Sequence, residues 1–411
     1  MKDDFLFYSY DNDKITDAAD MTRCLVSFAT EFGLEGNIWQ QWLTYSLMTD
    51  ENPFSLACER RKIREDSTLL KLARPDLAQF RELMHTEPSE LTGGFFSYRE
   101  DMTDLMTDYR RPYDDGSVNA PGRHITGLSR RLADAGGDDE FCRILTEEYE
   151  RYGAGIYSLF RAFRISEETS HLVPVAEASD VTFDDLIGYE RQKETLRANT
   201  EAFVSGQHAN NVLLYGDSGT GKSTSIHALM HDYFDRGLRL IEIGKQHRSM
   251  LPQIMSEIKR RNYKFIIFLD DLSFEENESD YKELKAMLEG ALEKREDSVL
   301  IYATSNRRHL IRETWRDRND MEYEQDIHRS DTMEEKLSLA ARFGVTIYYP
   351  KPDPREYLEI VRSLAERKGI ELSGTDLDDA AREWELRHGG MSGRTASQLI
   401  TWLEGRQTED E

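Results

Sequence analysis

The sequence predicts an α/β fold, with a parallel five-stranded sheet that follows a mainly α-helical N-terminal domain and precedes a C-terminal helical lid. Three observations lead to this prediction. Apolar residues recur at helical spacing in the first part of the chain. Short apolar runs then alternate with helical patterns, as they do in parallel sheets whose two faces are covered by helices. A glycine-rich loop follows the first of these runs.

The chain has 411 residues, which exceeds the usual length of one domain. Apolar spacing predicts helices over residues 19–32, 38–48 and 138–163. Residues 166–180 mix Ser, Glu, Pro and Ala, and this composition predicts a linker. We therefore expect a helical N-terminal domain at 1–175, an α/β core at 176–352 and a helical lid at 353–411.

Five apolar runs in the second half of the chain predict the strands of the sheet. Residues 265–269 are apolar throughout, which is typical of a strand buried on both faces. The predicted strands are residues 212–216, 238–243, 265–270, 299–304 and 345–349.

The composition is 38% hydrophobic and 32% charged, which favours a folded protein outside the membrane. No apolar run approaches about 18 residues, and residues 1–14 lack the apolar stretch of a secretory signal. We expect a cytoplasmic protein with no membrane partner. The formal net charge of −25 falls roughly equally on the two sides of residue 180. This charge disfavours nucleic acid and favours protein partners, although a local basic strip would be an exception.

The cysteines and two histidines of the N-terminal region suggest packing rather than chemistry. Cys24, Cys58 and Cys142 are widely spaced and form no CxxC pair, so we expect apolar packing rather than a disulfide framework or a zinc site. His124 and His171 are isolated in the sequence, which is more typical of packed or exposed side chains than of metal ligands.

The strongest motif is a G-x-x-x-x-G-K-S loop between a predicted strand and a predicted helix. Its glycines allow the backbone to wrap around phosphate oxygens, and the amides of a helix N-terminus present a positive dipole to the anion. Lys222 would neutralise the β- and γ-phosphates of ATP, and the Ser223 hydroxyl would bind Mg²⁺. The alternative is a merely glycine-rich turn. The expected nucleotide-binding residues here are Gly216, Asp217, Ser218, Gly219, Thr220, Gly221, Lys222, Ser223 and Thr224.

Polar residues also follow two later strands. Asp270 would hold Mg²⁺ through water, because this ion dehydrates reluctantly, and Asp271 would polarise the attacking water. The alternative is that these two carboxylates cap the following helix. Asn306 follows the next predicted strand, where a side-chain amide can orient water and sense the γ-phosphate. Asparagine is also an ordinary turn residue after a strand.

These residues resemble the AAA+ ATPase superfamily, and within it the prokaryotic family called domain of unknown function 815. The similarity runs from about Phe183 to Leu403. The resemblance implies an AAA+ core that binds ATP and Mg²⁺. It rests on the ordered motifs DLIGYE, GDSGTGKS, FLDDLSFE, YATSNRRHLI, SLAARFG and SGRTASQ.

The resemblance also implies roles for individual residues. Ile187 and Gly188 would lie near the adenine, and Asn306 would be the sensor 1 residue. Arg342 matches an arginine finger, which acts in a neighbour's site and therefore implies a homo-oligomer. Arg394 falls where a sensor 2 arginine would report the γ-phosphate from the lid. For each arginine the alternative is an ordinary solvated or ion-paired side chain.

One feature departs from the usual AAA+ pattern, in which the acidic motif ends in Asp-Glu. Asp271 is one methylene shorter than glutamate, which predicts slower hydrolysis or help from a nearby acid such as Glu275. An Asp-Asp pair is also similar to the helicase-loader and transposon-helper branches of the superfamily. Arg307 and Arg308, directly after Asn306, are further candidates for phosphate or interface contacts.

We expect an ATPase that drives an oligomeric switch or remodels a protein partner, and by analogy the N-terminal domain would recognise that partner. Three alternatives stay open at this stage. They are a helicase-loader-like or transposase-helper-like ATPase acting with nucleic-acid machinery, a small-molecule kinase on the same core, and a structural protein that binds ATP without hydrolysing it. The acidic charge disfavours the first, and the sensor and finger motifs fit the second poorly.

Overall fold

The computed structural model describes residues 18–86, 106–112, 118–175, 181–259, 261–272, 298–306, 342–370, 372 and 374–407. By compactness the chain divides into two units. The N-terminal unit comprises Met1–Arg161, Pro174–Ala178 and Arg261–Tyr263. The α/β unit comprises Ala162–Val173, Ser179–Arg260 and Lys264–Glu411.

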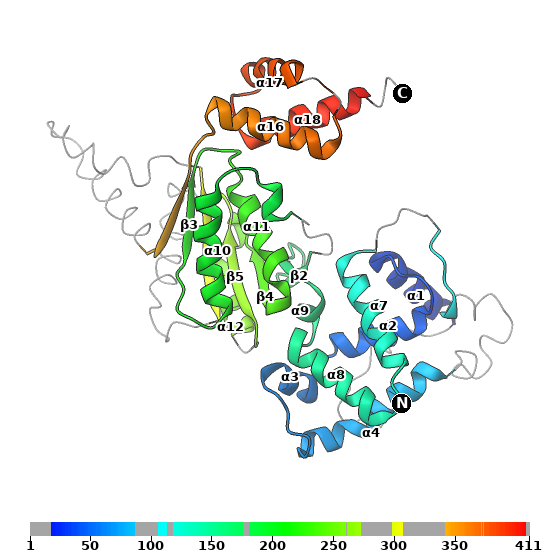
Figure 1. The fold of residues 1–411 in the computed structure, drawn as a ribbon. Coiled ribbons are helices and arrows are strands. Elements are labelled where there is room, and N and C mark those ends of the chain that lie inside the picture. Colours follow the sequence, from blue (N-terminus) through cyan, green and yellow to red (C-terminus); the bar gives the residue numbers. More distant parts are fainter. Residues whose placement is uncertain are drawn as a thin grey trace. The chain divides into compact units, whose positions relative to one another are not determined.

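The N-terminal unit is built mainly from helices, two of which the apolar spacing predicts at residues 19–32 and 38–48. Phe141 and Tyr149 are fully buried in its core. The Tyr149 hydroxyl donates a hydrogen bond to the Leu47 carbonyl at 2.5 Å, so its polar end is satisfied within the core. The described helices, blue to cyan in Figure 1, are α1 (Ala18–Phe32), α2 (Ile38–Thr49), α3 (Pro53–Arg60), α4 (Thr68–His85), α7 (Ala120–Ala133), α8 (Asp138–Tyr152) and α9 (Ile156–Leu159).

A buried ion pair lies inside the N-terminal unit. Glu59 on α3 accepts hydrogen bonds from the Arg261 guanidinium at 3.0 and 2.7 Å. The side chains of Arg261 and Glu59 are only 8% and 3% exposed. The Asn262 N–H also donates to Glu59, at 3.0 Å. These bonds satisfy a carboxylate that would be costly to bury alone.

The helix expected over residues 138–163 is interrupted, so that prediction was wrong. α8 ends at Tyr152, and the short helix α9 follows only after Gly153 and Gly155, whose φ angles are 78° and 74°. A Cβ on Gly153 would lie 1.8 Å from the Tyr263 hydroxyl oxygen, so only glycine fits this approach. Packing against a residue distant in the sequence therefore accompanies the end of α8.

Cys24, Cys58 and Cys142 are not joined to one another in a disulfide. Cys58 and Cys142 are buried, as predicted, whereas Cys24 is half-buried. Burial raises the pKa of the Cys58 thiol to about 12, so this side chain stays protonated and packs as a small apolar group.

Within the described residues, seven strands form the sheet of the α/β unit, in the order β2-β1-β4-β5-β6-β3-β7. The five predicted strands are present to within one residue at their ends, and their pairing is parallel. The predicted number of strands was wrong, because two further strands extend the sheet beyond β4. The strands are β1 (Ala162–Ile165), β2 (Leu172–Pro174), β3 (Val212–Gly216), β4 (Leu238–Glu242), β5 (Lys264–Leu269), β6 (Val299–Ser305) and β7 (Val345–Tyr349).

The two additional strands lie where the sequence predicts a helix end and a linker. β1 has four residues and β2 has three, which is too short for a period to be recognised. β1 forms by pairing in parallel with β4, with Phe163 opposite Ile241. Phe163 is fully buried, so tertiary packing rather than a local pattern stabilises this strand.

Parallel pairing brings the carboxyl ends of the central strands to one edge of the sheet. β3 lies between β6 and β7, whereas the next strand in the chain, β4, lies beyond β6 and β5. Ligands of open α/β sheets bind outside the carboxyl ends at such a change in strand order. The helices α10 (Glu190–Val204), α11 (Lys222–Tyr233) and α12 (Leu251–Ile258) lie along the sheet in Figure 1. Short 3₁₀ helices are η1 (Phe183–Asp185), η2 (Phe234–Arg236) and η3 (Lys245–Met250).

Three further helices form the C-terminal part of the α/β unit: α16 (Pro354–Lys368), α17 (Gly374–Arg387) and α18 (Gly393–Gln407). Local sequence explains the start of α16. The Asp353 carboxylate accepts hydrogen bonds from the N–H groups of Arg355 and Glu356 at 2.8 and 2.9 Å, and Pro354 occupies the first turn. Gly369, with φ of 65°, ends the helix.

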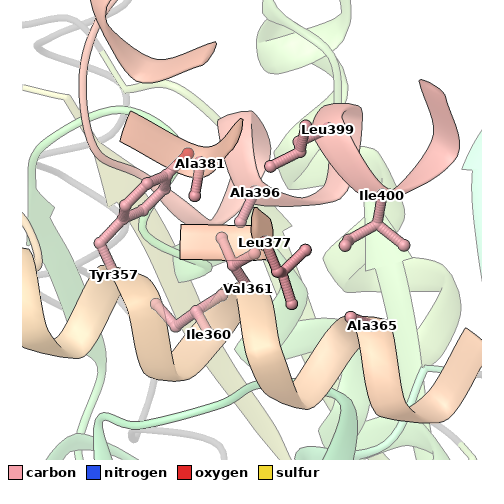
Figure 2. Packing of buried hydrophobic residues seen from close by; sticks show 9 residues of the cluster. All are labelled: Tyr357, Ile360, Val361, Ala365, Leu377, Ala381, Ala396, Leu399 and Ile400. Carbon is pink, nitrogen blue, oxygen red and sulfur yellow. The ribbon is translucent and has the colours of Figure 1, made fainter. Parts of the chain in front are cut away.

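The C-terminal helices have an apolar core of their own, which Figure 2 shows between α16, α17 and α18. Each of its members is less than a tenth exposed. They are Tyr357, Ile360, Val361, Ala365, Leu377, Ala381, Ala396, Leu399 and Ile400. Across the part of the chain that the structure describes, no helix has both the length and the apolarity to cross a membrane.

Leu399→Ala should destabilise the C-terminal helices by about 2–5 kcal/mol, because it truncates a side chain that is 1% exposed and leaves a cavity. Native-state hydrogen exchange of the α16 and α18 amides measures this free energy of opening. Leu386→Ala is the matched control: Leu386 is 80% exposed, and its truncation should change the free energy by less than about 0.5 kcal/mol. Equal effects of the two substitutions would contradict the packing in Figure 2.

Candidate nucleotide-binding site

The expected phosphate-binding loop connects β3 to α11, and close packing explains two of its glycines. Gly216 ends β3 with φ of 136°, and Gly221 precedes α11 with φ of 87°. A Cβ on Gly216 would lie 2.1 Å from the Tyr349 carbonyl oxygen of β7, and a Cβ on Gly221 would lie 2.2 Å from Leu186 Cδ1. A larger residue at Gly216 would displace the backbone of the loop or of β7, whereas at Gly221 the end of the Leu186 side chain would have to shift. The positive φ disfavours a residue with a side chain at both positions.

Lys222, the first residue of α11, is buried beneath the loop. Its ammonium group donates to the Asp217 carbonyl at 2.6 Å and to the Gly216 carbonyl at 3.2 Å. Burial lowers the pKa of Lys222 to about 8, although the nearby carboxylates of Asp217, Asp270 and Asp271 oppose this shift. Lys222 is therefore mostly charged at neutral pH but loses its proton far more readily than an exposed lysine.

Two hydroxyl groups hold the Asp270 carboxylate. Asp270 follows β5, and its Oδ1 accepts a hydrogen bond from Ser223 Oγ at 2.7 Å. The Thr304 hydroxyl on β6 donates to the same oxygen at 2.5 Å. The parallel register pairs Leu269 with Ala303, so the residues that follow them meet at the carboxyl ends of the two strands.

Asp271 adopts an unusual backbone conformation beside Asn306. Its φ is 48°, in the left-handed region, which aspartate enters more often than most residues with a side chain. The Asp271 N–H donates to Thr304 Oγ1 at 2.9 Å. The Asn306 side-chain amide donates to Asp271 Oδ1 at 2.8 Å. The Asp270 carboxylate is thus bonded to Thr304 of β6, and the Asp271 carboxylate is bonded to Asn306, which follows β6.

The segment after η1 forms one side of a cavity above the loop. Leu186 and Ile187 line this cavity, and Ile187 also packs against the apolar core of the C-terminal helices. Gly188 follows with φ of 78°, and Tyr189, with φ of 61°, precedes α10. The Tyr189 ring stacks on Tyr349 with a centroid distance of 5.2 Å, which fixes this segment against β7.

The C-terminal helices form another side of the cavity. The Arg394 N–H, in the first turn of α18, donates to the Gly219 carbonyl of the loop at 3.4 Å. The Arg394 side chain is exposed and lines the cavity, together with Ile360 and Leu364 of α16. Apolar and cationic groups of these helices therefore face the same space as the loop.

The cavity volume is about 510 Å³, within the usual range for a small-molecule site. Gly188, Gly216 and Asp217 belong to the bordering segments but not to the cavity wall. The expected site residues that do line it are Ile187, Ser218, Gly219, Thr220, Gly221, Lys222, Ser223, Thr224, Asp270, Asp271, Asn306 and Arg394.

Arg342 lies away from this cavity. It is exposed and precedes β7, whose first residue, Val345, pairs with Val212, the first residue of β3. Because β3 and β7 are parallel, Arg342 lies at the amino edge of the sheet and the loop at the carboxyl edge. A strand of this length separates the two edges by about 16 Å, so Arg342 does not reach the loop of its own chain.

Several residues of the cavity were not predicted from the sequence. Thr304 was expected only as the end of a strand, yet its hydroxyl contacts both the Asp270 side chain and the Asp271 backbone. The sequence signal that could have identified Thr304 is its place at the end of a predicted strand that could pair with β5. Other missed residues are Asp185, Leu186, Tyr189, Ile360, Leu364, Gly393 and Ser397. Glu275, Arg307 and Arg308, which the sequence suggests, lie outside the described residues.

The residues present suit a nucleoside triphosphate with Mg²⁺. Ser223 and Asp270 supply the hydroxyl and carboxylate oxygens that Mg²⁺ prefers, and they are already in hydrogen-bonding contact. The Ser223 proton is directed to Asp270, so the hydroxyl lone pairs stay available to a metal. α11 begins at the loop and presents the positive end of its dipole to an anion there.

Comparison with known proteins gives a family match over more than half of the chain. The family described as "Protein of unknown function (DUF815)" matches residues 158–407. The replication factor C large subunit of Methanococcus maripaludis is 34% identical over 74 residues, 18% of this chain and 15% of that protein. The ATP-dependent zinc metalloprotease FtsH of Aquifex aeolicus is 24% identical over 249 residues, 54% of this chain and 35% of that protein. The chain thus spans well under half the length of these relatives.

A solved structure of the Thermotoga maritima RuvB Holliday junction branch migration motor is also similar, at 17% sequence identity and a TM-score of 0.38. The similarity covers 54% of this chain and 63% of the RuvB chain.

Gly216→Ala should destabilise the α/β unit by about 3 kcal/mol or more, because backbone strain and the clash with Tyr349 act together. Urea denaturation of the full chain measures the change. Gly206→Ala is the control: its φ is also positive, at 73°, but nothing lies within 4 Å of the added Cβ. Strain alone should cost about 1 kcal/mol there. Equal stability of the two variants would contradict the close approach of β7 to Gly216.

Proposed function

This chain belongs to the family described as "Protein of unknown function (DUF815)", and we propose that it is an AAA+-type ATPase. ATP hydrolysis with Mg²⁺ would drive an oligomeric switch or remodel a protein partner. The supporting observation is the chain of contacts from Ser223 through Asp270 and Thr304 to Asp271 and Asn306. A phosphate-binding loop alone would suit a kinase or a non-hydrolysing protein equally well, whereas hydrolysis also requires groups that position water.

Phosphate binding is assigned to the loop and to the first turn of α11. Lys222 would exchange its hydrogen bonds with the Gly216 and Asp217 carbonyls for phosphate oxygens. Ser218 to Thr224 line the cavity, so backbone N–H groups of this segment would bind the same anion. Phosphoryl transfer depends mostly on such positioning and charge stabilisation.

The metal-binding role falls to Ser223 and Asp270. Bound Mg²⁺ would neutralise charge on the β- and γ-phosphates. Ser223 keeps its proton directed to Asp270 and offers a lone pair to the metal. Asp270 would hold the ion through its water ligands, because Mg²⁺ dehydrates reluctantly.

Asp271 and Asn306 are proposed to act on the attacking water. Asp271 would accept a proton from this water, and Asn306 would orient the water molecule. The two side chains are bonded to each other at 2.8 Å. Asn306 would therefore turn from Asp271 toward the γ-phosphate, which frees the carboxylate for the water.

The C-terminal helices are proposed to act as the lid that senses nucleotide. Arg394 lines the cavity, and its backbone N–H is bonded to Gly219 of the loop. Arg367 of α16 pairs with Asp185 of the cavity wall, at 3.1 Å. Ile187, expected near the adenine, packs against the core of these helices. A bound nucleotide would therefore contact both the sheet and the C-terminal helices.

Arg342 is proposed to act in the site of a neighbouring subunit. Its place at the amino edge of the sheet supports this role, because it does not reach the loop of its own chain. A guanidinium that crosses a subunit interface would stabilise charge on the transferring phosphoryl group. Catalysis would then depend on assembly into a homo-oligomer.

Partner choice is assigned to the N-terminal domain, residues 1–175. The net charge of −25 favours a protein partner over nucleic acid. The expected boundaries, of this domain at 175 and of the lid at 353, stay predictions.

ATP binding should weaken as the pH rises above about 8. The pKa of Lys222 is lowered to about 8, so its ammonium is present below that pH and lost above it. A bound phosphate group favours the charged lysine and raises the pKa of Lys222. ATP binding is therefore accompanied by uptake of a proton by Lys222 between about pH 8 and the pKa of Lys222 in the complex. Fluorescence titration with a labelled ATP should show affinity falling by up to about tenfold per pH unit in this range.

Lys222→Arg is the matched variant for this experiment, because a guanidinium stays charged throughout the range. Its affinity should be lower at neutral pH, since the larger group does not fit the buried lysine position. Its affinity should not change between about pH 7 and 9.5. The same pH dependence in both proteins would assign the titration to another group.

Arg342→Ala should lower phosphate release by about 10³-fold while ATP affinity changes by less than about twofold. Phosphate release and sedimentation, measured together at several protein concentrations, should show wild-type turnover that rises with assembly. Turnover that is independent of concentration and of Arg342 would leave a monomeric nucleotide-binding protein and contradict the oligomeric mechanism.

Mixing two inactive variants sharpens this test. Lys222→Ala retains Arg342 but lacks its own phosphate lysine, and Arg342→Ala has the reverse defect. Random mixing in equal amounts should restore about a quarter of the sites, because about one interface in four then joins a subunit with an intact Lys222 to a neighbour with an intact Arg342. No recovery in confirmed mixed oligomers would show that Arg342 does not act across the interface.

A further inference from the structure

Thr304 at the end of β6 contacts both acidic residues of the site. Its side chain is buried, with 2% of the residue exposed. The hydroxyl donates its one proton to Asp270 Oδ1 at 2.5 Å and accepts a hydrogen bond from the Asp271 N–H at 2.9 Å. A hydroxyl has one proton and two lone pairs, so both bonds form together and fix the orientation of the group.

Thr304 also binds the backbone of the turn that follows β5. Its carbonyl accepts the Leu272 N–H at 2.7 Å, so two successive amides of this turn bind the same residue. Asp271, the first of these two residues, has φ of 48°. A left-handed conformation of a residue with a side chain persists only when its surroundings fix it. Thr304 supplies that restraint.

The contacts of Thr304 also affect the side chains of Asp270 and Asp271. Asp270 Oδ1 receives both Thr304 and Ser223, so the threonine orients the carboxylate against the serine of the loop. Asp271 Oδ1 lies 2.8 Å from the Asn306 amide while its backbone is held by Thr304. A single hydroxyl therefore connects the expected metal ligand with the expected general base.

We propose that Thr304 is a positioning residue for both carboxylates of the site. Its hydroxyl sets the Asp270 carboxylate for the metal and holds the turn that presents Asp271. This inference rests on the proposed ATPase function and deepens it. Thr304 acts through the two aspartates, so its loss should change the response to Mg²⁺ more than the binding of nucleotide alone.

The test compares Thr304→Val, which keeps the shape and removes the hydroxyl, with Thr304→Ser, which keeps the hydroxyl. Thr200→Val is the matched control: Thr200 is also fully buried in the α/β unit, and its hydroxyl bonds to Tyr302 of β6 at 2.8 Å, outside the cavity lining. Affinity for a fluorescent ATP analogue is measured in EDTA and over a Mg²⁺ titration with the full chain. Phosphate release is measured in parallel.

Thr304→Val should raise the Mg²⁺ concentration for half-maximal tightening of nucleotide binding by about 10–100-fold, as expected for a residue that orients a metal ligand. Its affinity in EDTA should stay within about twofold of wild type, and its phosphate release should fall by a similar 10–100-fold. Thr304→Ser should restore both Mg²⁺ response and turnover to within about threefold, and Thr200→Val should behave as wild type.

A Thr304→Val protein with the wild-type Mg²⁺ response would overturn the inference and leave the ATPase proposal intact. Equal losses in Thr304→Ser and Thr304→Val would also overturn it, because the hydroxyl would then not be the active group. Parallel losses of affinity in EDTA and in Mg²⁺ would assign Thr304 a purely structural role. A wild-type chain that binds no nucleotide would defeat the proposed function, and this inference with it.

Discussion

Parallel pairing of four neighbouring strands is the constraint on which the candidate site depends. β5, β6, β3 and β7 run in one direction, so their carboxyl ends share an edge. The register places Leu269 opposite Ala303 and therefore brings Asp270 to Thr304. A slip of β6 by one residue would turn Thr304 to the other face and separate the pair. Main-chain hydrogen bonds thus fix which polar groups can meet.

β7 extends this constraint to the C-terminal helices. The Tyr349 carbonyl packs against Gly216 and accepts a hydrogen bond from the Asp217 N–H at 3.3 Å. The Tyr349 hydroxyl donates a hydrogen bond to Ser225 Oγ at 2.8 Å. Two residues later, the Lys351 N–H donates to Asp217 Oδ2 at 3.1 Å. The segment that leads into α16 is therefore bonded to the candidate phosphate loop. A change in the loop would reach these helices through contiguous hydrogen bonds, which is the physical requirement for coupling.

The parts of the fold that follow from nearby residues were predictable from the sequence. The five central strands and the glycine-rich loop each have a local pattern of apolar runs or spacing. β1 has no such pattern, because it forms by pairing with β4. The end of α8 involves packing of Gly153 against Tyr263, and the contacts of Thr304 arise from the register between two strands. The distance of Arg342 from the cavity likewise follows from the pairing of β7 with β3, and no local pattern encodes which strands pair.

The left-handed backbone of Asp271 gives a physical reason for the aspartate that departs from the Asp-Glu pattern. Aspartate occupies this region several-fold more often than most residues, because its short polar group bonds locally, and glutamate lacks that advantage. The shorter side chain also meets the Asn306 amide at 2.8 Å. Thr304 holds both amides of this turn, so it stabilises a backbone that aspartate accepts more readily than glutamate. The short carboxylate and the left-handed turn therefore suit one another, because this backbone conformation favours aspartate over glutamate.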